Sequence, residues 1–132
     1  LQFVYKFKGA DKTALCTDAM RGAGMPDGES ILGSLTNGQK VIIEDGVAKL
    51  PDRSAFAGSV ATADRLVRTM INIAGIPLID AIRMITLTPA RILHVDSQKG
   101  SLEEGKDADI VIFDNQINVT TTISKGHVIY NQ

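Results

Sequence analysis

The residue best placed to do chemistry is Asp18, which follows the nearly all-apolar run at residues 13–17 and precedes a glycine-rich loop. Such a run, after a helix and a tight turn, is typical of a buried parallel strand. Catalytic groups of (β/α) barrels lie at the carboxyl ends of the strands. A carboxylate there can take a proton from a metal-bound water and return it to a leaving amine. A turn aspartate without function fits the same position.

The other reactive side chains are weaker candidates. His94 and His127 lack ligand spacings such as H-x-H or H-E-x-x-H, which favours surface or packing roles. Cys16 lies within the apolar run, where we expect a buried small hydrophobe. Arg21 could bind a phosphate through its charge, although a solvated loop arginine fits its position better. The glycine-rich loop does not match a nucleotide-binding loop, because a hairpin follows it instead of a helix.

Turn signals and hydrophobic periods predict the elements that position these residues. Apolar residues at helical spacing predict a helix over residues 3–7, which Gly9 ends. Between residues 29 and 50, the dipeptides Asn37-Gly38 and Asp45-Gly46 predict type I′ turns in a three-stranded meander.

From residue 60 onward, the pattern predicts three helices followed by strands. Gly75 separates the first two helices, and Pro77 suits the first turn of the second. Thr88 is the predicted N-cap of the third helix, with Pro89 at its first position. The predicted apolar faces are Ala63, Leu66, Val67, Met70, Ile71 and Ala74 in the first helix, and Leu78, Ile79, Ile82 and Ile85 in the second. The predicted strands are residues 110–113, 119–123 and 128–130.

Composition argues against several classes of protein. With 14 basic and 15 acidic residues and no Lys/Arg run, the chain lacks an electrostatic footprint for nucleic acid. No apolar run approaches the roughly 18 residues of a membrane span. The single cysteine excludes an intrachain disulfide and favours a reducing, cytoplasmic location. The 132 residues begin with Leu1 and fall short of the roughly 250 residues of a complete barrel, so we expect a fragment of a longer chain.

Four short segments, in order along the chain, form a recognisable set. They are Thr17-Asp18-Ala19-Met20 with its glycine-rich loop, Ala57-Gly58-Ser59, the Arg-Met and Pro-Ala-Arg pair within residues 83–91, and residues 100–111. Together they resemble the N-acetylglucosamine-6-phosphate deacetylases of the amidohydrolase superfamily. The last segment follows the wider superfamily pattern G-x-I/L-x-x-G-x-x-A-D-L/I-V, whereas the first two point to the sugar deacetylases.

This resemblance implies an α/β fold in two parts. Residues 1–95 would form the last strand and flanking helices of a TIM-like (β/α)8 barrel, with the meander inserted at residues 29–50. Residues 96–132 would form the C-terminal share of a small β-sandwich. Within residues 100–111 we expect structural roles for Asp107 and Asp109, with Asp109 holding a turn.

The resemblance also implies a reaction. The parent enzyme, a cytoplasmic homo-oligomer, would hydrolyse N-acetylglucosamine 6-phosphate to glucosamine 6-phosphate and acetate in amino sugar catabolism. Asp18 would be the catalytic acid/base, and Ala57, Gly58 and Ser59 would help to bind the substrate. A divalent metal ion, zinc or similar, would be held by a glutamate and histidines from earlier strands. We expect no metal ligand within this chain, and therefore no activity of the isolated chain.

Two alternatives remain open. The superfamily pattern at residues 100–111 also fits a dihydroorotase-like or deaminase-like amidohydrolase. A non-catalytic, β-rich interaction module is an alternative from another class.

Overall fold

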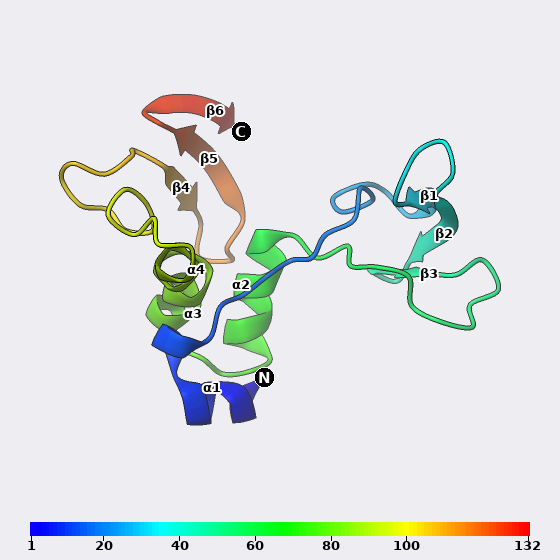
Figure 1. Cartoon of the computed structure of the whole chain (residues 1–132), viewed down its shortest axis with the longest axis horizontal. Coiled ribbons are helices and arrows are strands. Elements are labelled where there is room, and N and C mark those ends of the chain that lie inside the picture. Colours follow the sequence, from blue (N-terminus) through cyan, green and yellow to red (C-terminus); the bar gives the residue numbers. More distant parts are fainter. The chain divides into compact units, whose positions relative to one another are not determined.

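A computed structural model describes residues 1–132, and the chain divides into two compact units. The meander unit is Cys16–Arg65, and the helical unit comprises Leu1–Leu15 and Leu66–Gln132. The helices, in chain order, are α1 (Gln2–Lys8), the 3-10 helix η1 (Ala10–Lys12), α2 (Ala63–Asn72), α3 (Leu78–Ile85) and α4 (Leu87–Ile92) (Figure 1). The strands are β1 (Gly28–Leu32), β2 (Gln39–Glu44), β3 (Val47–Lys49), β4 (Ile110–Phe113), β5 (Val119–Ser124) and β6 (His127–Asn131).

Helix α2 carries the apolar stripe that its sequence predicts. Val67 and Met70 are buried, and Ala74, just beyond the helix, is buried with them. The helix gives way to a turn in which Gly75 adopts φ of 64°. That left-handed conformation is easily accessible only to glycine, which explains why the helix stops here. The predicted stop is therefore confirmed, and so is the predicted face, except that Ala63 at its start is exposed.

Helix α3 buries a different side from the one predicted. Ala81 and Met84 are fully buried, whereas Leu78 and Ile79 are 44% and 67% exposed. Ile82 and Ile85 pack at the margin of the same core. Six of the eight residues of this helix are apolar, so its sequence does not define a narrow stripe. The contacts with the rest of the core select the face.

Helix α4 begins two residues earlier than predicted, and Thr88 is not its N-cap. Thr86 occupies the N-cap position, while Thr88 is buried and its hydroxyl donates a 2.7 Å hydrogen bond to the carbonyl of Ala10. Pro89 lies inside the first turn, where a missing N–H leaves no helical hydrogen bond unmade. Thr88 thus ties α4 to η1 instead of capping a helix.

The three predicted C-terminal strands are present and form one antiparallel sheet. Strand β5 lies between β4 and β6 (Figure 1). Ser124 pairs with His127, and the two residues between them, Lys125 and Gly126, have φ of 48° and 80°. Positive φ at both central residues defines a type I′ hairpin, the geometry that suits the twist of the flanking strands.

The predicted strand at residues 13–17 does not form. The segment is extended, and the amide of Leu15 donates to the carbonyl of Met84, in α3, at 2.8 Å. No strand within residues 1–132 pairs with it, and a lone extended segment lacks the ladder that stabilises a strand. Consequently Cys16 is exposed, which corrects its predicted burial.

The meander unit contains the three antiparallel strands β1, β2 and β3 in sequence order. The turn at Asp45-Gly46 is the predicted type I′ turn, with φ of 53° and 71° at its two residues. The turn predicted at Asn37-Gly38 is wrong. Leu32 pairs with Gln39, so a longer loop joins β1 to β2, and φ is negative at both Asn37 and Gly38.

Candidate active site

Asp18 lies at the start of a segment that runs beside a second predicted site segment. Its side chain is exposed, and its backbone has φ of 46°, a conformation that aspartate tolerates better than most residues. Ala19 forms a parallel bridge with Ser59, and the amide of Met20 donates to the carbonyl of Ser59 at 2.8 Å. The structure therefore brings the predicted catalytic residue and the predicted substrate-binding residues into one unit.

The second segment, residues 57–59, combines a buried anchor with accessible backbone. Ala57 is buried, and its amide donates to the carbonyl of Ala48 on β3 at 2.8 Å. Gly58 is exposed and has φ of 100°, a value that side-chain-bearing residues rarely adopt. The hydroxyl of Ser59 accepts a 3.1 Å hydrogen bond from the amide of Ala61. Exposed backbone at Gly58 is suited to contact a ligand closely.

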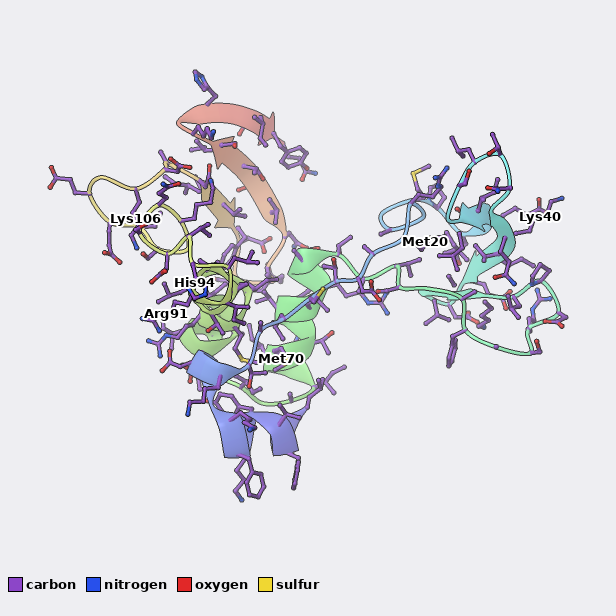
Figure 2. The ribbon with its side chains drawn as sticks, viewed as in Figure 1. Met20, Lys40, Met70, Arg91, His94 and Lys106 are labelled. Atoms are coloured by element: carbon purple, nitrogen blue, oxygen red, sulfur yellow. The ribbon has the colours of Figure 1, made fainter.

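Met20 has a structural role that sequence patterns did not indicate. Its sulfur accepts a 2.9 Å hydrogen bond from the amide of Gly22, and its side chain packs against the core formed by Ile43, Ala48 and Val60. Figure 2 labels Met20 on the segment that leads into β1. Arg21, next in sequence, donates to the carbonyl of Gly33 at 2.9 Å. This contact gives the arginine a structural role at the end of β1.

A charged cluster holds the loop that precedes residues 57–59. Glu44 accepts hydrogen bonds from Arg53 Nε at 2.9 Å, Arg53 Nη2 at 3.0 Å and Lys49 Nζ at 3.1 Å. The hydrogen bonds from Arg53, and then the one from Lys49, lower the pKa of the Glu44 carboxyl. Arg53 has φ of 60°, a strained conformation for a residue with a side chain. Its bonds to Glu44 anchor this strained turn to β2. No residue spacing predicts this cluster, because Glu44 ends β2, Lys49 ends β3 and Arg53 lies in the bend that follows.

Residues 11–129 match the amidohydrolase family. The chain belongs to the amidohydrolase family.

Its relatives within that family are sugar-phosphate deacetylases. The chain is 40% identical over 128 residues to the N-acetylglucosamine-6-phosphate deacetylase of Lysinibacillus sphaericus, covering 97% of this chain and 32% of the relative. It is 39% identical over 118 residues to a putative N-acetylgalactosamine-6-phosphate deacetylase of Escherichia coli K12, covering 89% of this chain and 68% of the relative. The crystal structure of the Pasteurella multocida N-acetylglucosamine-6-phosphate deacetylase superposes with a TM-score of 0.87 at 31% identity, covering 98% of this chain and 33% of that one. The chain thus spans about a third of the length of the N-acetylglucosamine-6-phosphate deacetylases it matches.

Amidohydrolases are generally metal-dependent, and the residues of this chain do not fit a metal site. His94, labelled with Arg91 in Figure 2, and His127 are both exposed. Residues 1–132 contain no group of three or more His, Cys, Asp or Glu side chains placed to hold an ion. No catalytic step is therefore assigned to a metal held by this chain.

None of the helices of this chain is long and apolar enough to cross a membrane.

The superfamily motif at residues 100–111 of this amidohydrolase has a structural role. Lys99 donates to Asp107 at 2.7 Å and to Asp109 at 2.5 Å. Asp109 also accepts a 2.8 Å hydrogen bond from the amide of Lys125, in the β5–β6 turn. The hydrogen bond from Lys99, and then that from Lys125, lowers the pKa of the Asp109 carboxyl. The prediction that Asp109 holds a turn is confirmed.

The helical unit also contains an apolar hollow of about 690 Å³ between α4 and the β4–β6 sheet. The charged groups on its wall, Lys99, Asp107 and Asp109, are paired with one another. None of the predicted catalytic or substrate-binding residues lines it. We therefore assign the candidate active site to the meander unit.

Proposed function

We propose that this chain is the C-terminal third of an enzyme that hydrolyses N-acetylglucosamine 6-phosphate to glucosamine 6-phosphate and acetate. The observation that carries the proposal is the hydrogen bond from Met20 to Ser59, which places the Asp18 segment beside residues 57–59. Relatives covering nearly all of this chain are N-acetylglucosamine-6-phosphate deacetylases, which supports the same substrate class. The parent enzyme is the full-length protein of which this chain would be the C-terminal third.

In this proposal Asp18 is the acid/base of amide hydrolysis. Its exposed carboxylate takes a proton from the attacking water and returns it to the nitrogen of the departing amine. The accessible backbone at Gly58 forms one wall of the substrate site. The divalent metal ion, zinc or similar, belongs to residues outside this chain, so the isolated chain is inactive. Polarising the amide carbonyl is the chemistry that such an ion supplies.

For the parent enzyme we further propose the architecture expected from the sequence. Residues 1–95 would supply the last strand and flanking helices of a barrel, in which residues 13–17, extended and unpaired in this chain, would gain a neighbouring strand; residues 96–132 would form the C-terminal share of a small β-sandwich. The parallel bridge between Ala19 and Ser59 supports the first part, because barrel strands pair in parallel. The antiparallel β4–β6 sheet supports the second. A cytoplasmic homo-oligomer is part of the same proposal.

Acetate release by the purified parent enzyme tests the function. We expect Asp18→Asn to lower kcat by several orders of magnitude while metal content and fold are retained, since the amide cannot accept the proton. Asp27→Asn, in the same exposed loop, is the matched control and should leave kcat unchanged. Full activity of Asp18→Asn would show that Asp18 is a turn aspartate without a catalytic role.

The second candidate substrate is the C4 epimer, N-acetylgalactosamine 6-phosphate, because a relative of 39% identity bears that name. Comparing kcat/KM for the two sugar phosphates decides between them. Hydrolysis of neither would favour another amidohydrolase reaction, such as a dihydroorotase-like or deaminase-like one, or a non-catalytic role.

A further inference from the structure

The carboxylate of Asp18 has no partner that would hold it in place. It forms no hydrogen bond or ion pair within residues 1–132. Acid/base catalysis requires the proton-transferring group within hydrogen-bonding reach of its target. The position of this carboxylate therefore depends on the backbone that carries it, and that backbone is fixed two residues later.

Three contacts meet at Met20. Its amide donates to the carbonyl of Ser59 at 2.8 Å, and its sulfur accepts from the amide of Gly22 at 2.9 Å. Its side chain also fills the space beside Gly58. A Cβ built on Gly58 would lie 3.2 Å from Met20 Cγ and from Leu32 Cδ1 and 3.5 Å from Met20 Cβ, so Met20 and Leu32 leave little room for a side chain at Gly58.

The far side of the methionine contacts the meander core. Its partly buried side chain packs on the cluster of Ile43, Ala48 and Val60, so moving away from Gly58 would cost contacts with that core. Gly22 is buried against the same groups, since a Cβ there would lie 2.2 Å from Ile43 Cδ1 and 2.9 Å from Met20 Sδ. Met20 is thus wedged between the meander core and the proposed substrate wall.

We propose that Met20 is a positioning residue: its side chain sets the separation between the Asp18 backbone and the backbone of Gly58. This inference rests on the proposed function of Asp18. A shorter side chain still allows the backbone hydrogen bond between Met20 and Ser59. It removes the side-chain packing that holds this bond in a single geometry. Misplacing a catalytic group by about 1 Å can cost a hundredfold in rate.

The test compares Met20→Ala and Met20→Leu in the parent enzyme, with N-acetylglucosamine 6-phosphate as substrate. We expect Met20→Ala to lower kcat about ten- to a hundredfold while KM changes less than about threefold. Leucine refills most of the volume, so Met20→Leu should restore kcat to within about threefold of the wild-type value. Met25→Ala is the control, since Met25 lies in the same loop and is 63% exposed.

Each result decides the inference. A folded Met20→Ala enzyme with wild-type kcat, or with only KM raised, would overturn it, as would a Met20→Leu enzyme as slow as the alanine variant. If Met20→Ala does not fold, Met20→Val takes its place, with at least a fivefold loss of kcat expected and an unchanged kcat overturning the inference. A wild-type parent enzyme that releases no acetate would instead refute the proposed function, and with it this role for Met20.

Discussion

The hydroxyl of Thr88 donates a 2.7 Å hydrogen bond to the carbonyl of Ala10, although the two residues are 78 positions apart. Thr88 is 1% exposed and Ala10 is 7% exposed, so neither group has ready access to water. The bond ties α4 to η1 across the core of the helical unit. A hydrogen bond in such surroundings matters mainly through the cost of leaving its acceptor unpaired.

Replacing Thr88 by valine should therefore destabilise the protein. Valine keeps the shape of the side chain but leaves the carbonyl of Ala10 buried without this donor, at a cost of about 1–3 kcal/mol. Thermal and denaturant unfolding of the parent enzyme measure the loss. Thr88→Ser keeps the hydroxyl and should recover part of it, and equal stability of the valine and serine variants would show that the bond contributes nothing.

The same substitution at Thr13 should have the opposite sign. Thr13 Oγ1 is buried without a hydrogen-bond partner. Thr13→Val removes an unsatisfied polar atom at constant shape, so the free energy of unfolding should stay equal or rise by up to about 1 kcal/mol. A loss of stability comparable to that of Thr88→Val would mean that the Thr13 hydroxyl has an acceptor in the parent enzyme.

Gly100 should tolerate a methyl group much less well than Gly105. Both have positive φ, 90° and 87°, so alanine at either position costs about 1 kcal/mol of backbone strain. A Cβ at Gly100 would lie 2.7 Å from Ala90 Cβ, whereas nothing lies within 4 Å at Gly105. We expect Gly100→Ala to lower the Tm clearly more than Gly105→Ala. Equal shifts would show that α4 moves aside at little cost.

The Glu44 cluster predicts a specific dependence on pH. Hydrogen bonds from Arg53 and Lys49 lower the pKa of Glu44, so the ionised carboxyl is favoured in the folded state. Its contribution to stability is fully present above the ordinary glutamate pKa of about 4.3 and is lost as the pH falls through the lower folded value. The Tm of Glu44→Gln should therefore decline less than that of the wild type between neutral pH and acid.

A control variant and a kinetic measurement test the role of Glu44 further. Glu29→Gln, on the exposed side of β1, has no ion pair to lose and should follow the wild-type pH profile. Because Arg53 anchors the loop before residues 57–59, Glu44→Gln should also raise KM for the sugar phosphate in the parent enzyme. If the Tm of the wild type and of Glu44→Gln declined in parallel as the pH falls, Glu44 would not contribute to the loss of stability in acid.

Local patterns predicted those elements whose cause lies within a few residues. Positive φ is needed at both positions of a type I′ turn, so Asp45-Gly46 was recognisable as a turn. The dipeptide Asn37-Gly38 carries the same signal, but the pairing of Leu32 with Gln39 produces a longer loop instead. Strand pairing overrode the turn preference because the register of the whole hairpin involves more contacts than its tip.

The candidate site divides in the same way. Sequence by itself determined the helices, the C-terminal strands, the family resemblance and the choice of Asp18 and residues 57–59, since each depends on residue types at short, regular spacings. Only the tertiary structure decided that Met20 joins these two segments, that Glu44 gathers Arg53 and Lys49, that Thr88 bonds to Ala10, and that Cys16 faces outward. The Met20–Ser59 and Thr88–Ala10 bonds link segments far apart in the chain, and the Glu44 cluster depends on how β2, β3 and the following turn fold together, so packing geometry, not residue spacing, selects them.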